Sequence, residues 1–148
     1  TQIATWVLIV VTAVADVFGY YICKYVWSQI VVGWDQFRPI TNEAVAFPML
    51  IALFYVGTLF AYVILFNMLK LLDNMKASKV FIKDNTKLMK NMSVACIAIF
   101  AICFVAMLVW PSLLFIGIIG LFMGLIVQCV RVVMDKAIDM RDELDYTV

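Results

Sequence analysis

The chain contains no histidine, so it lacks the side chain that most often binds metals and carries protons near neutral pH. It has four cysteines, but no two of them form a CxxC pair, and neither a zinc site nor a redox pair is indicated. We interpret the cysteines as small, buried packing residues. The sequence also lacks an HExxH motif, a GxSxG motif, a P-loop and a dinucleotide-binding glycine pattern. These absences predict a protein that is not an enzyme and that uses no cofactor or metal.

Charged residues are scarce. They make up 14% of the 148 residues, whereas 66% are hydrophobic, and the mean hydropathy is +1.06. Soluble domains are roughly 45–50% apolar and about 25% charged. A chain of this size cannot hide that excess in one core, but a bilayer removes the need to hide it. The sequence therefore predicts a single-domain integral membrane protein over residues 1–148. The net charge of +1 argues against a direct nucleic-acid partner.

Apolar runs long enough to cross a ~30 Å hydrocarbon layer at ~1.5 Å per residue occur four times. The expected spans are about 3–26, 46–69, 93–110 and 113–131. Pro48 suits the first turn of the second span, where a missing N–H costs little. Trp110-Pro111-Ser112 is expected to form the turn that divides the last two spans. The predicted fold is all-α, a polytopic membrane protein with four transmembrane helices in two hairpins and the fourth helix extended into the cytoplasm.

The one long polar interval inside the apolar chain runs from Lys70 to Met92. It holds six of the eleven basic residues and only two aspartates. A short, basic segment between two spans is typical of a cytoplasmic loop under the positive-inside rule. With four spans, this loop, 70–92, places both termini and the tail, 132–148, in the cytoplasm. Trp27, Trp34 and Trp110 then lie at the outer membrane interface, the level that aromatic rings prefer.

Asp16 is the strongest candidate for a functional group. It lies ~15 Å from the outer end of the first span, near the membrane midplane. A charged carboxylate there is costly, so it is expected to face the protein interior, to pair, or to stay protonated. Thr12 shares its helical face, and Tyr55 or Thr58, at matching depth on the second span, is expected to bring a hydroxyl to it. One interpretation is a proton- or ion-responsive site, and the other is a hydrogen-bonded packing group.

Three glycines on the fourth span, Gly117, Gly120 and Gly124, predict close helix packing. Gly120 and Gly124 form a small-xxx-small pair, and Gly117 lies near the same face. Small residues on the third span match them: Ala95, Ala98, Ala101 and Ala106. The pattern is common in membranes and does not identify a homodimer.

The basic loop and the tail are expected to form a small cytoplasmic cap. Asp84 or Asn85 is predicted to N-cap the third helix. Apolar residues recur in the tail at helical spacing, at Val133, Ala137, Met140 and Leu144. Acidic tail residues are expected to form weak, salt-screened pairs with the lysines. The residues expected to act in this interaction are Lys79, Phe81, Lys83, Asn85, Lys87, Asp142, Glu143 and Asp145.

Two segments of the second half resemble a known family. They are KVFIKDNTKLMKNMSV before the third span and VVMDKAIDMRDELDYTV at the end of the chain. This part of the chain resembles the bacterial membrane-protein family called domain of unknown function 2975. The matching residues are Phe81, Asn85, Leu88, Glu143, Asp145, Thr147 and Val148. The glycine and proline usual in that family before the aromatic residue are replaced here by Ser78, Lys79 and Val80. The resemblance implies a four-span protein of the bacterial inner membrane, with no established activity, often encoded beside a small helix-turn-helix regulator.

These features favour a membrane-bound sensor or regulatory partner that binds a soluble cytoplasmic protein through the cap. A homo-oligomeric ion channel or small transporter built around Asp16 is the first alternative. A small structural or immunity-type membrane protein is the second. The bilayer is the partner common to all three hypotheses.

Overall fold

A computed structural model describes residues 2–33 and 42–147, and helices account for most of them. The helices are α1 (Gln2–Val17), α2 (Gly19–Gly33), α3 (Glu43–Lys76), α4 (Lys83–Ala106) and α5 (Leu113–Tyr146). No strand occurs in the two described ranges, so the all-α prediction is confirmed for them. Trp34 and Val148, which the sequence analysis singled out, lie outside the described residues.

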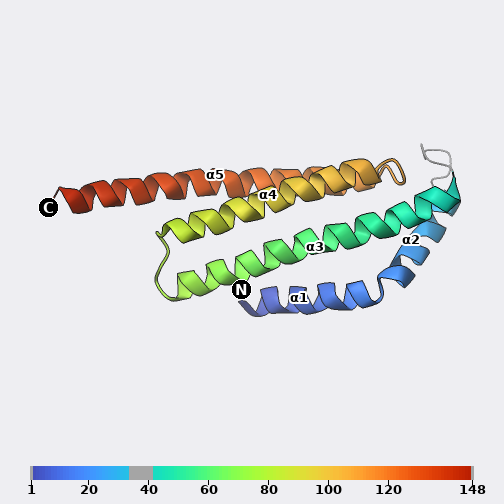
Figure 1. Ribbon diagram of the computed structural model, residues 1–148, viewed down its shortest axis with the longest axis horizontal. Coiled ribbons are helices and arrows are strands. Elements are labelled where there is room, and N and C mark those ends of the chain that lie inside the picture. The colour runs from blue at the N-terminus through green and yellow to red at the C-terminus, as the bar shows by residue number, and fades with distance from the viewer. Residues whose placement is uncertain (1, 34–41, 148) are drawn as a thin grey trace.

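The long helices lie side by side in a series: α1 packs on α3, α3 on α4, and α4 on α5 (Figure 1). The end that holds the α4–α5 turn, residues 107–112, together with α2 and the start of α3, is called here the Trp110 end. The opposite end, with the α3–α4 turn of residues 77–82, is called the lysine end. At the lysine end the Gln2 side chain donates a hydrogen bond to Asp73 and accepts one from Lys76. The start of α1 therefore lies beside the segment 70–92, which holds six lysines and is called here the basic turn.

Three helices, α3, α4 and α5, are each long and apolar enough to cross a membrane. Helices α1 and α2 pass the same test only together, and they are bent by 74° at Phe18. The expected first span, 3–26, is thus two helices with a break rather than one continuous helix. The described residues thus hold three helices that could cross a membrane, or up to four if the bent pair is one span. Together with the composition, this makes the chain a membrane protein.

The polar interval 70–92 is mostly helical. Helix α3 continues through Lys76 and α4 begins at Lys83, which leaves only residues 77–82 between them. Lysine, leucine and methionine are good helix formers, and a helix pairs its backbone groups while long polar side chains reach water.

Helix α3 also begins earlier than expected, because the side chain of Asn42 caps it by accepting from the Ala44 amide at 3.1 Å. Pro48 therefore lies in the second turn and not in the first.

The turn 77–82 has a defined backbone. Ser78 has φ 59°, and its amide donates to the Met75 carbonyl at 3.1 Å. The Lys79 amide donates to the Asn74 carbonyl at 3.0 Å. These two bonds form a Schellman motif, in which a left-handed residue closes the helix and satisfies its last carbonyls. Ser78 thus takes a backbone conformation that usually favours glycine.

The side chain of Asn85 stabilises this turn through hydrogen bonds. Its side-chain amide donates to the carbonyls of Lys79 and Val80, both at 2.8 Å, and its Oδ1 accepts from Asn74 at 2.7 Å. The residue is fully buried. The N-cap of α4 is Ile82, without a side-chain hydrogen bond, so neither Asp84 nor Asn85 caps the helix as predicted. The Asn85 amide is engaged with the turn instead.

Two of the three glycines on α5 pack against α4. A Cβ on Gly117 would lie 2.8 Å from the Cβ of Cys103, and one on Gly124 would lie 2.8 Å from the Cβ of Cys96. Both distances are too short for real Cβ atoms, so the helices approach closely only because glycine stands there. Nothing lies within 4 Å of a Cβ built on Gly120, so the packing role predicted for it is not realised. The partners on α4 are cysteines rather than the expected alanines.

Ser93 adds a hydrogen bond to this interface. Its hydroxyl donates to the Gly124 carbonyl at 3.0 Å, and the bond is buried.

The interpretation of the cysteines as buried packing residues holds for Cys23, and Cys96 and Cys103 are half-buried. It is wrong for Cys129, which is exposed.

The main buried apolar cluster lies at the Trp110 end. It consists of Ile30, Ala46, Leu50 and Val109, with Val26, Trp27, Met49, Trp110 and Leu113 packed around it. Helix α2 reaches this cluster because the bend at Phe18 turns it across the start of α3 (Figure 1). The bent pair therefore packs at both ends of α3.

Candidate functional site

The intramembrane polar group of the sequence analysis, Asp16, lies between α1 and α3. The Tyr62 hydroxyl donates to Asp16 Oδ2 at 2.8 Å. The Tyr55 hydroxyl donates to the main-chain carbonyl of Asp16 at 3.3 Å. The other carboxyl oxygen, Oδ1, is buried and has no hydrogen-bond partner. One carboxyl oxygen is thus bound by α3, and the second retains its capacity to accept.

This site adjoins the break between α1 and α2. A Cβ on Gly19, at the start of α2, would lie 2.9 Å from Phe54 Cε1 and 2.9 Å from Tyr55 Oη. Glycine is therefore what lets the bent chain approach α3 at this point. The bond from Tyr55 to the Asp16 carbonyl supplies a donor to the main chain near the break. The two tyrosines thus bind both the side chain and the backbone of Asp16.

The predicted site is assembled only in part. Tyr55 reaches Asp16, but through its backbone and not through its carboxyl. Thr58 and Thr12 bond within their own helices, to the carbonyls of Tyr55 at 2.9 Å and Leu8 at 2.8 Å. The sequence analysis missed Tyr62, the residue that binds the carboxyl. Tyr62 lies seven residues after Tyr55, on the same helical face, and that spacing is the signal that could have found it.

The predicted interaction residues at the lysine end are mostly accessible. Lys79, Phe81, Lys83, Lys87, Asp142, Glu143 and Asp145 are all exposed. Asn85 is the exception. Because it is buried and all its bonds are internal, its role is to hold the turn and not to contact another molecule.

Ion pairs between the basic turn and the acidic tail do not form in the described part of the chain. The salt bridges of these residues are Lys87–Asp84 at 3.9 Å and Arg131–Asp135 at 3.8 Å, each within one helix. Helix α5 is continuous to Tyr146, and its last turns extend beyond the start of α4 (Figure 1). The acidic residues are therefore carried past the lysines. The predicted pairing is wrong because the tail is a straight helix.

The last turns of α5 present an apolar stripe that no part of the described chain covers. Val133, Met140 and Leu144 are 68%, 60% and 68% exposed. Ile138, on a different face of the same helix, is only 4% exposed. Among the described helices α5 packs on α4 alone, so the buried face is the one turned to α4. The stripe predicted from the sequence is thus real, but it faces outward.

The fold and this site define a helical membrane protein with a polar contact inside its apolar region and a helix that extends beyond its neighbours. The sequence model of the family described as "Protein of unknown function (DUF2975)" matches residues 2–148. The chain belongs to this family. The resemblance noted in the second half is therefore confirmed, and its extent is corrected, since the match also includes α1, α2 and α3. No curated protein and no solved structure matches the chain.

Proposed function

We propose that the chain is a membrane-embedded regulatory partner that binds a soluble cytoplasmic protein through the last turns of α5. The observation that carries this proposal is the exposed stripe of Val133, Met140 and Leu144 on a helix that extends beyond α4. Three large apolar side chains aligned on one helical face are typical of a helix that docks in the groove of another protein.

The length of α5 supports this assignment. Its 34 residues span ~51 Å at ~1.5 Å per residue, whereas the hydrocarbon layer is ~30 Å thick. The part that follows Arg131 carries most of the charges of the helix, so this part extends into water. The stripe then lies outside the hydrocarbon layer, where a lipid chain does not cover it.

The charges around the stripe indicate the chemistry of the partner. Asp142, Glu143 and Asp145 are exposed and form no ion pair in the described chain. A partner groove with a basic rim would be attracted to these carboxylates and would place its apolar floor on the stripe. The acidic end of α5 therefore favours a partner with a basic docking surface.

The topology we propose has four spans, with the bent pair α1–α2 as the first. The N-terminal end of α1, the basic turn and the end of α5 then share the lysine end. The positive-inside rule favours the cytoplasm for that end, and the membrane we propose is the bacterial inner membrane. A soluble cytoplasmic protein would meet the end of α5 in this orientation.

Site-specific photo-crosslinking in cells tests the proposal. A photoreactive residue at position 144 should capture a soluble protein, and one at Phe122, 64% exposed in the spanning part of α5, should not. Reversal of Asp142, Glu143 and Asp145 to lysine should weaken the adduct at position 144 without changing the membrane level of the chain. Asp84→Lys, also at the lysine end, is the matched control and should leave the adduct unchanged. Adducts at position 144 that contain only lipid or only this chain would overturn the proposal.

Asp16 supports a second candidate, a homo-oligomeric ion channel or small transporter. The supporting observation is Oδ1, a buried acceptor without a partner beside a helix break. Intramembrane carboxylates of this kind mark ion and proton pathways in membrane proteins. This candidate predicts that the purified protein is an oligomer and that it conducts ions in liposomes. Asp16→Asn should abolish that ion flux. A monomeric particle with no flux at any pH would remove it.

A further inference from the structure

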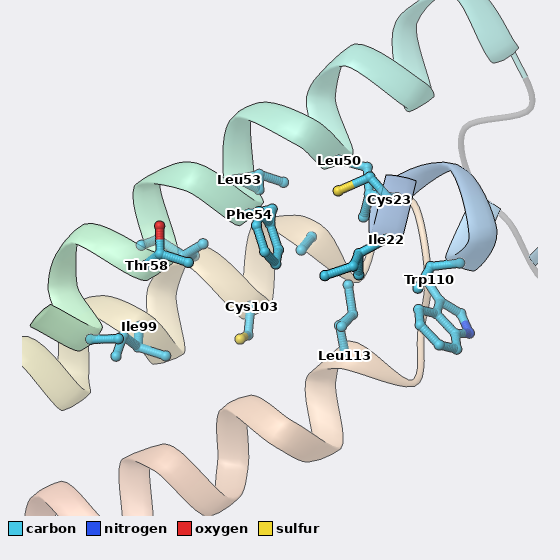
Figure 2. A pocket seen from close by; sticks show the side chains of 15 residues that line it. Ile22, Cys23, Leu50, Leu53, Phe54, Thr58, Ile99, Cys103, Trp110 and Leu113 are labelled. Carbon is cyan, nitrogen blue, oxygen red and sulfur yellow. The ribbon is translucent and has the colours of Figure 1, made fainter. Parts of the chain in front are cut away.

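An apolar cavity of ≈ 410 Å³ lies between α2, α3 and α4, next to the α4–α5 turn (Figure 2). Ile22 on α2, Phe54 on α3 and Ile99 on α4 line it, and Leu113 at the start of α5 lines it at the Trp110 end. Among the described helices α2 packs only on α1 and α3. The 74° bend therefore brings α2 to the Trp110 end without packing it along α4, and the cavity is the space between them.

The walls select hydrocarbon. None of the 15 lining side chains is charged. The only hydroxyl is that of Thr58, which donates to the Tyr55 carbonyl at 2.9 Å on its own helix. Figure 2 shows the indole nitrogen of Trp110 turned away from the other labelled residues. The indole nitrogen is buried without a hydrogen-bond partner, so a polar ligand would exchange its hydrogen bonds to water for few partners in this space.

The position of the cavity indicates where the hydrocarbon comes from. The α3 and α4 residues of the lining, 50–61 and 99–106, belong to membrane-crossing helices. Around such helices the neighbouring molecules are lipid chains and not water. The volume is within the range of pockets that hold small ligands, ~300–1,000 Å³. A close-packed protein interior does not leave this much apolar space without partner atoms.

We propose that this cavity binds one acyl chain of a membrane phospholipid. The acyl chain lies between α2 and α4 and supplies the van der Waals contacts that these helices do not make with each other. It thereby stabilises the bent arrangement of α1 and α2. The proposal does not depend on the function assigned to α5.

Two glycines provide a matched pair of variants. A Cβ on Gly57, which lines the cavity, and a Cβ on Gly120, which does not, would each have nothing within 4 Å. Gly57→Leu therefore adds a side chain to the cavity wall from a Cβ with no close neighbour, and Gly120→Leu adds the same side chain to α5, away from the cavity. The full chain is purified in mild detergent, and bound lipid is measured by native mass spectrometry.

The wild-type protein and Gly120→Leu should each retain one phospholipid. The fraction of Gly57→Leu that retains a phospholipid should be lower by at least about tenfold. Palmitoyl-oleoyl phosphatidylethanolamine added to the delipidated protein should raise the Tm of the first two and leave the Tm of Gly57→Leu unchanged. The unchanged fold of Gly57→Leu is checked by circular dichroism. Equal retention by the two variants, a wild-type chain without phospholipid, or retention of a free fatty acid instead would each overturn the proposal.

Discussion

At the scale of single residues, two residues have opposite effects on the stability of the turn 77–82. Ser78 is the one non-glycine residue with positive φ in the described chain. Asn85 is buried and binds two carbonyls of the turn. The first residue is strained by its conformation, and the second stabilises the conformation. Substitutions at the two positions should therefore change stability in opposite directions.

Ser78→Gly should stabilise the protein by about 1 kcal/mol, because glycine has no Cβ to crowd the following carbonyl in the left-handed region. The measurement is denaturant unfolding in detergent micelles. Ala77→Gly is the control, since Ala77 has φ −75° and gains nothing from glycine. A Ser78→Gly variant that is less stable than the wild type would contradict this account of the turn.

Asn85→Ala should destabilise the protein by about 2–4 kcal/mol, because the carbonyls of Lys79 and Val80 and the amide of Asn74 lose a buried partner. Asn67→Ala removes a bond within one helix, to the Val63 carbonyl, and should cost much less. The same unfolding assay compares the two. Equal losses would show that Asn85 does not hold the turn.

At the scale of helices, the contact between α4 and α5 depends on the spacing of Gly117 and Gly124. Seven residues separate them, and seven separate their partners Cys103 and Cys96. A repeat of seven keeps one face of each helix on the other along the whole contact. Gly120 lies between the two and is outside this face, although it completes the more familiar small-xxx-small pattern.

Gly124→Ala should destabilise the protein by about 1–3 kcal/mol, because a methyl group 2.8 Å from Cys96 forces α4 and α5 apart. Gly120→Ala should be neutral or stabilising by up to about 1 kcal/mol, because alanine is the better helix former and the space is open. Thermal unfolding in the same detergent measures both. The reverse order would show that Gly120 is at the contact.

At the scale of the whole molecule, the helices contact one another in series and bury few residues. Most side chains of the long helices therefore face the surroundings, which are lipid for the apolar parts. The contact of Gln2 with Asp73 and Lys76 joins the N-terminal end of α1 to the lysine end. The orientation of the lysine end consequently decides the orientation of every other part.

Thiol labelling in intact cells tests this orientation. In a variant without native cysteines, Lys79→Cys should react with a membrane-impermeant reagent only after the cells are permeabilised, because lysine-rich turns stay in the cytoplasm. Ser112→Cys, in the turn at the opposite end, should react in intact cells. Labelling of position 79 from outside would invert the topology and would remove the proposed role of α5.

The sequence predicted correctly those features that depend on the sum of residue properties along one segment. Ala44–Leu69 has no charge and lies inside α3, and Trp110-Pro111-Ser112 lies in the turn between α4 and α5. The expectation that a hydroxyl of the second span meets Asp16 is confirmed for Tyr55, which reaches the main-chain carbonyl, but Thr58 does not reach Asp16, and Tyr62, which binds the carboxyl, was missed.

The sequence alone determined that this chain belongs in a membrane, where its apolar helices lie, and which turn is basic. Those properties follow from transfer free energies, which each residue contributes independently of its distant neighbours. Only the tertiary structure decided that the first span is bent, that Gly117 and Gly124 rather than Gly120 contact α4, and that Asn85 is buried. Each of these depends on the relative position of two helices, and that position results from side-chain packing between segments far apart in the chain.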